Sequence, residues 1–137
     1  LQGTFRAMDE EWRLKAHSIM KKMAEQIAEA MGGSCDFDIR MGYPCVVNEE
    51  KLTKNSFSAA QDYLGIENVV LLEPRMTGED FSFYSQQMPG CFYRLGTGNK
   101  EKGIISGVHT PTFDIDESAL EIGSGLMAWL AVAALKG

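Results

Sequence analysis

Residues 9–33 read DEEWRLKAHSIMKKMAEQIAEAMGG and predict one long amphipathic helix. Asp9 is placed to cap its first turn, and the two glutamates that follow suit the positive end of the helix dipole. Gly32 and Gly33 end the helix in the usual way. Apolar side chains recur at helical spacing along one face: Trp12, Ala16, Ile19, Met20, Met23, Ile27, Ala30 and Met31. The opposite face, which we expect to be solvated, carries Arg13, His17, Lys21 and Glu25.

Short segments on both sides of this helix have the alternation of β-strands. Residues 1–8 place Thr4 and Arg6 on one face and Phe5 on the other. Residues 35–42 alternate in the same way. The three segments together predict a β-α-β unit, in which one helix lies across a layer of sheet.

The chain after residue 43 predicts a second set of elements. Tyr43-Pro44 marks a break, because the residue before a proline is driven out of the helical region. Helices are expected at residues 49–64, from the turn at Thr77–Phe81 to about residue 88, and at 117–135. Strands are expected at 68–72, where we expect burial, and at 91–95. A glycine-rich loop follows at residues 96–107.

The last helix is apolar nearly all round. Ser118, Glu121 and Ser124 interrupt it, so we expect a buried core helix rather than a membrane span. Such a helix must be covered by several neighbours, and the second half of the chain offers few. A larger sheet would cover it better. Together with a first residue, Leu1, that is not methionine, this pattern predicts a piece of a larger protein.

Composition and charge limit the class of protein. The chain has 137 residues, 45% of them hydrophobic and 23% charged, as in soluble globular proteins. A net charge of −6 argues against nucleic-acid binding. No signal peptide is visible, and no membrane partner is expected. Three widely spaced cysteines form no Cys-x-x-Cys pair, so free thiols in the cytoplasm are the simplest interpretation.

Two features could bind an anionic group. Arg6, fixed on a strand face, could hold a carboxylate through two parallel hydrogen bonds; the alternative is an exposed arginine on an edge strand. Thr77-Gly78-Glu79-Asp80 precedes a helix, where free N–H groups favour anions. Thr77 or Asp80 could instead simply cap that helix.

His109 is the candidate metal ligand, in the loop GVHTPTFDID at residues 107–116. Imidazole is the commonest metal ligand in proteins, and Pro111 stiffens the backbone just after it. A structural or surface role is the alternative. No second histidine or cysteine lies at ligand spacing, and Asp114 and Asp116 are expected to begin the last helix. His17, the other histidine, is expected on the surface.

Several blocks, taken in order over essentially all 137 residues, resemble one family, the metal-dependent N-acyl-amino-acid amidohydrolases. That family includes hippurate hydrolases and indole-acetyl-amino-acid hydrolases, and it is related to aminoacylases and bacterial zinc carboxypeptidases. Any single block is weak, but five in register are specific. They are GTFR at 3–6, GYPCVVN at 42–48, MTGEDFSFY at 76–84, MPGCFYRLG at 88–96, and VHTP at 108–111 with FDIDE at 113–117.

The resemblance implies a fold and a set of roles. It implies an α/β catalytic domain with a ferredoxin-like lid inserted into it. Residues 1–43 would be the second half of the lid, a dimerisation domain, and residues 44–137 the last part of the catalytic domain of zinc-exopeptidase type. His109 would be a ligand of the divalent metal, which is zinc, manganese or cobalt. Arg6 would grip the substrate carboxylate, and Thr77, Gly78 and Glu79 would line the substrate pocket.

The family's other metal ligands and its general-base glutamate would lie before Leu1. The expected function is therefore hydrolysis of N-acyl amino acids, such as hippurate, or of small peptides by the complete enzyme. We expect the chain alone to be inactive. The alternative from another class is a non-catalytic module that forms a homodimer through the lid surface. A third alternative is an unrelated α+β domain with a chance His-Pro loop.

Overall fold

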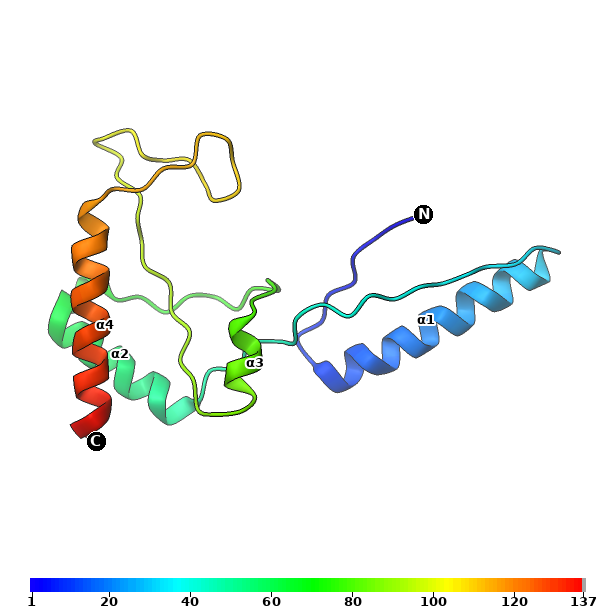
Figure 1. Ribbon diagram of the computed structural model, residues 1–137, viewed down its shortest axis with the longest axis horizontal. Helices are drawn as coiled ribbons and strands as arrows, with labels where there is room; N and C mark the ends of the chain where they lie inside the picture. Colours follow the sequence, from blue (N-terminus) through cyan, green and yellow to red (C-terminus); the bar gives the residue numbers. More distant parts are fainter. Residues whose placement is uncertain (137) are drawn as a thin grey trace. The chain divides into compact units, whose positions relative to one another are not determined.

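The computed structural model describes residues 1–136 as four α-helices and one 3₁₀ turn joined by long irregular segments (Figure 1). They form two units. The first contains residues Leu1–Val47 and Glu73–Met88, and the second contains Asn48–Leu72 and the chain from Pro89 onward. The chain thus leaves the first unit close to the predicted boundary at residue 43, but residues 73–88 return to it. The roles of lid and catalytic part stay predictions.

The first unit is built on helix α1, Glu10–Ala30. Asp9 caps it as predicted, because its carboxylate accepts the amide of Trp12 at 2.8 Å. The helix ends where the glycines predict: Gly32 has φ of 76°, and the amide of Gly33 bonds back to the carbonyl of Ala28 at 2.9 Å. The short helix α3, Phe81–Ser85, belongs to the same unit.

The predicted solvated face of α1 is wrong at Arg13. The Arg13 side chain is buried because it forms an ion pair with Glu10 at 2.6 Å. The carboxylate of Glu10 also accepts the amide of Cys45 at 2.8 Å, which ties that segment to the start of the helix. His17, predicted on the surface, is partly exposed, and its ring meets the ring of Phe5 edge-on with the two centroids 5.9 Å apart.

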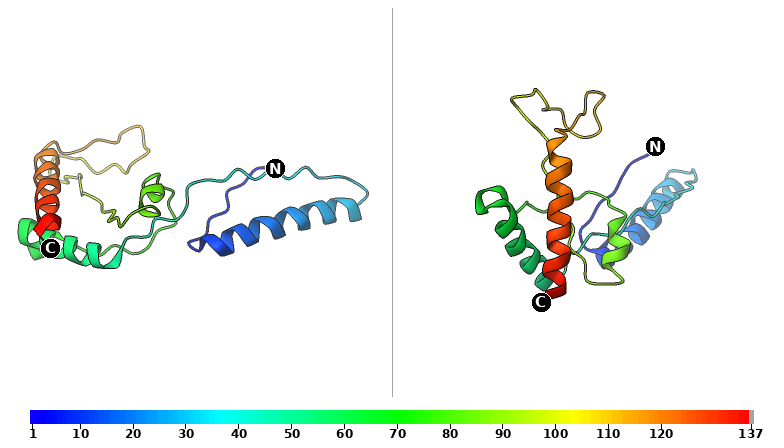
Figure 2. Two further views of the ribbon diagram at one scale, coloured as in Figure 1. Left: turned by 60° about the horizontal axis from the view of Figure 1, so that its bottom comes forward. Right: turned by 60° about the vertical axis from the view of Figure 1, so that its left-hand side comes forward.

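Helices α2, Glu50–Leu64, and α4, Ser118–Lys136, form the core of the second unit. They lie side by side in all views (Figures 1 and 2). The indole of Trp129 donates to the carbonyl of Ala59 at 2.9 Å and stacks on Tyr63 at 6.1 Å between ring centroids. The buried apolar residues of the two helices are Ala59 and Ala60 on α2, and Ala119 and Leu126 on α4. Glu49 caps the start of α2, because its carboxylate accepts the amides of Lys51 and Leu52.

The predicted strands at 1–8, 35–42, 68–72 and 91–95 make no ladder within residues 1–136. The backbone pairing in this part of the chain is a single antiparallel bridge, Asn99 to Ile104. A strand needs a neighbour for its amide and carbonyl groups, so the α/β fold class stays a prediction. The burial expected at 68–72 is wrong. Asn68 closes the 3₁₀ turn Ile66–Asn68, and Leu71 is 82% exposed because nothing in the unit covers it.

Helix α4 is less covered than the prediction of a buried core helix requires. Ala119 and Leu126 are its buried residues within the described chain. By length and composition alone α4 could also cross a membrane, a test that the core helix of a soluble protein passes equally. Helix α2 packs on one side of α4, as a neighbour of a core helix would.

Candidate functional site

Arg6 lies beside the loop that the sequence predicts to line the substrate pocket. Its guanidinium donates a hydrogen bond to the carbonyl of Met76 at 3.2 Å, across 70 residues of sequence. Met76 directly precedes Thr77, and both segments belong to the first unit. The Arg6 side chain is exposed, and a guanidinium has five N–H donors, of which this bond uses one. The structure therefore holds Arg6 at Met76, the residue that directly precedes the predicted pocket residues 77–79.

Gly78 has an aromatic neighbour. A Cβ at Gly78 would lie 3.4 Å from the ring of Tyr43, which in turn meets the ring of Phe83 edge-on at 5.9 Å. Tyr43 stands in one of the quoted blocks, but sequence reasoning gave it no role beyond the break at Pro44. Tyr43 therefore lies within van der Waals distance of position 78.

The start of α3 does not match the predicted side-chain cap. Asp80 occupies the N-cap position with helical backbone angles and makes no side-chain capping bond. The Ser82 hydroxyl instead donates to the carbonyl of Glu79 at 2.6 Å. With only five residues, α3 is also too short to build a helix dipole for anion binding.

His109 is exposed and belongs to the second unit. The long loop that contains it runs up to the N-terminal end of α4 (Figure 1). The φ of His109, 65°, puts it in the left-handed region, which residues other than glycine seldom adopt. Two bonds shape the turn: the Thr110 hydroxyl donates to the carbonyl of Gly107 at 2.8 Å, and the Phe113 amide bonds to the carbonyl of Thr110 at 3.1 Å. Backbone strain of this kind often accompanies functional loops.

The described residues do not by themselves fit a complete metal centre. Within residues 1–136, no group of three or more His, Cys, Asp or Glu side chains is placed to hold a metal ion. A zinc site needs three or four protein ligands. His109 has the right chemistry for one of them, and Cys35, Cys45 and Cys91 are free thiols that do not join it.

Asp116 anchors the loop that carries His109. The Asp116 carboxylate accepts bonds from the Lys102 ammonium at 2.8 Å, the Asn99 amide, and the backbone amide of Ser118 at 3.2 Å. Of the two aspartates predicted at the start of the last helix, Asp116 thus bonds to the first residue of α4, whereas the Asp114 carboxylate accepts the amide of Ile115 instead. The Lys102 bond, followed by those from Asn99 and Ser118, holds the pKa of the Asp116 carboxyl well below its usual range. Sequence reasoning missed Asn99 and Lys102, although a polar turn ending in Gly103 (φ 73°) was visible.

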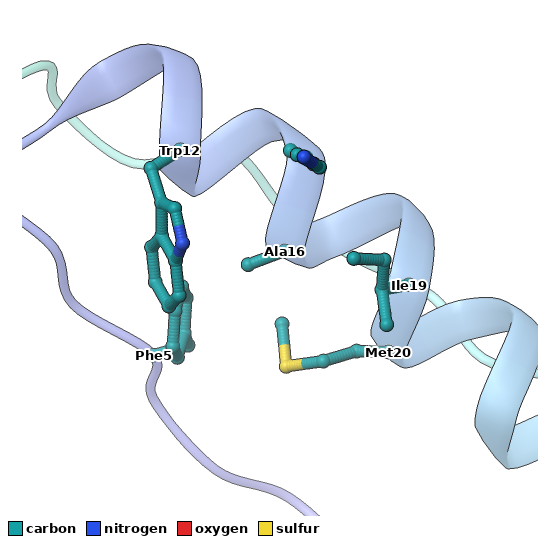
Figure 3. Close-up of a pocket in the computed structure, with 6 residues that line it drawn as sticks. Phe5, Trp12, Ala16, Ile19 and Met20 are labelled. Carbon is teal, nitrogen blue, oxygen red and sulfur yellow. The ribbon is translucent and has the colours of Figure 1, made fainter.

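The first unit also carries a shallow apolar groove of about 210 Å³. In Figure 3, the rings of Phe5 and Trp12 face each other at one end, and Met20 and Ile19 close the other. Lys15 is its one charged lining residue. Its other lining residues are apolar, so the groove suits packing rather than chemistry.

The comparison with known proteins decides the family. Residues 2–133 match peptidase family M20/M25/M40. The chain belongs to this family. It is 35% identical over 133 residues to thermostable carboxypeptidase 1 of Saccharolobus solfataricus, covering 96% of this chain and 33% of that protein. It is 34% identical over 137 residues to IAA-amino acid hydrolase ILR1-like 4 of Arabidopsis thaliana, covering 94% of this chain and 30% of that protein.

Membership of family M20/M25/M40 confirms the resemblance and makes the chain part of a hydrolase family. Enzymes of the family generally depend on divalent metals. The chain spans about a third of the length of the curated relatives that it matches.

Proposed function

We propose that this chain is part of a metal-dependent amidohydrolase that cleaves the amide bond of N-acyl amino acids, of the hippurate kind, or of small peptides. Family membership supports the hydrolase class, and the relatives include one named a carboxypeptidase and one named an IAA-amino acid hydrolase. The observation that carries the substrate assignment is the Arg6–Met76 bond, which holds an exposed guanidinium beside residues 77–79. A product amino acid has a free carboxylate, and arginine pairs with carboxylates through two parallel bonds.

In this proposal the residues that bind substrate and the residue that binds metal have separate roles. Arg6, Thr77, Gly78 and Glu79 bind and orient the substrate, and His109 is one ligand of the metal. The bound metal would activate water and polarise the amide carbonyl. Since the described residues supply no complete ligand set, we propose that the remaining ligands and the general base belong to a part of the enzyme outside this chain, and that this chain alone is inactive.

The experiment compares two proteins. The protein expressed from the complete gene should hydrolyse hippurate and N-acetyl amino acids, and a chelator should abolish this. The 137-residue chain alone should show no turnover with added zinc, manganese or cobalt. Metal-dependent turnover by the chain alone would refute its inactivity, and absence of any N-acyl amino acid hydrolysis by the complete protein would refute the substrate class.

A second proposal concerns association. We propose, as the alternative role, that residues 1–43 pair with a second copy of the chain through the apolar face of α1. Trp12, Met23 and Ile27 on this face are 55%, 54% and 58% exposed. The alternative is that the predicted sheet, and not a second copy, packs on the same face. Light scattering distinguishes these two possibilities. The double variant Met23→Glu, Ile27→Glu should convert a dimer to a monomer, whereas the control Lys22→Glu should not. A monomeric parent protein would contradict this proposal.

A further inference from the structure

The loop between residue 97 and helix α4 is closed at its neck. The amide of Asp116 donates to the carbonyl of Thr97 at 2.8 Å. Beyond the neck, Asn99 and Ile104 exchange backbone bonds of 2.9 and 2.8 Å and close a small polar lobe. These bonds fix where the loop begins and ends, and His109 lies between those points.

The Asp116 side chain connects three parts of this loop. One carboxylate oxygen accepts from Lys102 and from the Ser118 amide, and the other accepts from the Asn99 side chain. The carboxylate is 7% exposed although it is charged. A carboxylate with so little access to water keeps its charge because these donors replace the lost water, and each donor restrains its position. The polar lobe is therefore fixed to the first turn of α4.

The second half of the loop is held separately and more weakly. The hydroxyls of Ser106 and Thr112 pair at 2.8 Å across the turn that contains His109, and both ends of this pair are near the surface. His109 itself has the left-handed backbone described above. A residue keeps such a conformation only where its surroundings define it, and the neck bonds and the Ser106–Thr112 pair are the contacts on either side of His109 in the sequence.

We propose that Asp116, with Lys102 and Asn99, is a positioning residue that holds the His109 loop in one conformation. This inference rests on the proposed function in one respect, the role of His109 as a ligand. The competing explanation is that Asp116 merely caps α4. Lys102 separates the two explanations, because its ammonium bonds to Asp116 but takes no part in the cap.

The variants are therefore Lys102→Met, Lys102→Arg as the conservative variant, and Lys100→Met as a matched control in the same lobe. All are made in the protein expressed from the complete gene. Amide hydrogen exchange over residues 104–113 reports on the loop, zinc affinity in a chelator competition reports on the ligand, and thermal unfolding reports on the helix cap.

We expect Lys102→Met to raise loop exchange several-fold and to weaken zinc binding by about 10- to 100-fold, the usual effect of losing a residue that orients a ligand. Lys102→Arg should restore both, and the unfolding midpoint should stay unchanged. Equal loop exchange in Lys102→Met and Lys100→Met would overturn the positioning role. If His109→Ala does not lower the zinc affinity, His109 is not a ligand. The positioning role of Asp116 would then be overturned as well, whatever the exchange of the loop amides shows.

Discussion

The guanidinium of Arg6 donates a hydrogen bond to the carbonyl of Met76, 3.2 Å away. The two residues come from blocks that are 70 positions apart, and the bond places a cation at the edge of residues 77–79. A flexible arginine held at one point loses less freedom when it binds a carboxylate than one that is unrestrained. The contact therefore gives the proposed carboxylate clamp a physical basis.

Removal of the Arg6 guanidinium should weaken binding of substrates that carry a free carboxylate. In the protein from the complete gene, we expect Arg6→Ala to raise KM for N-acyl amino acids roughly 10- to 100-fold, which corresponds to a charge-assisted hydrogen bond of about 1.5–3 kcal/mol. KM for the matching amides should change little. Arg40→Ala is the control, because Arg40 is a nearly fully exposed arginine of the same unit. Equal effects on acids and amides would refute the clamp.

The contact between α2 and α4 should be sensitive to bulk at Gly125. A Cβ at this position would overlap the hydroxyl of Tyr63, whose ring stacks on Trp129. Gly125→Val should therefore lower the free energy of unfolding by about 1–3 kcal/mol, as overpacking of a core does. The control Ser124→Ala, at an exposed position of the same helix, should stay within about 0.5 kcal/mol. Chemical denaturation measures both, and equal stabilities of the two variants would show that the helices do not pack in this way.

The closed loop should open in acid. The pKa of Asp116 lies below the ordinary aspartate value of about 3.9, chiefly because Lys102 bonds to its charged form. The charged Asp116 carboxylate therefore stabilises the closed loop fully above the ordinary aspartate pKa. This stabilisation is lost as the pH falls toward the lowered pKa. We expect the protection of the amides of residues 99–116 from hydrogen exchange to decrease once the pH is below about 4. Amides in the last turns of α2 serve as the reference.

Asp116→Asn is the test of that assignment. The asparagine keeps an oxygen for the Ser118 amide but cannot ionise. Loop protection in this variant should be lower at neutral pH and should not change further in acid. The same acid-dependent loss in the parent protein and in the variant would assign the effect to another group.

The helices could be predicted from sequence because their signals are local. The Asp9 cap, the glycines after α1 and the apolar periodicity each depend on residues within a few positions of one another. The strands could not be tested in the same way, since a ladder depends on a neighbouring strand. The burial of Arg13 depends on Glu10 three positions away, yet the helical pattern placed Arg13 on the solvated face.

The candidate site was predicted only where the family blocks marked it. Arg6 and His109 stand in such blocks, but their neighbours depend on contacts over long separations. Asn48 is an example: its side-chain amide pairs with both backbone groups of Phe92, at 2.9 and 2.7 Å, across 44 residues. An asparagine that pairs with a backbone segment in this way has no local pattern, so sequence periodicity could not reveal it.

The two histidines provide the most direct test of the central claim. The protein from the complete gene should be prepared as His109→Ala and as His17→Ala, and bound divalent metal and hydrolysis of N-acyl amino acids should be measured for each. We predict that His109→Ala loses metal and activity together, while His17→Ala, whose ring packs on Phe5, keeps both. Metal content and turnover that are the same in the two variants would contradict the assignment of His109 as a metal ligand.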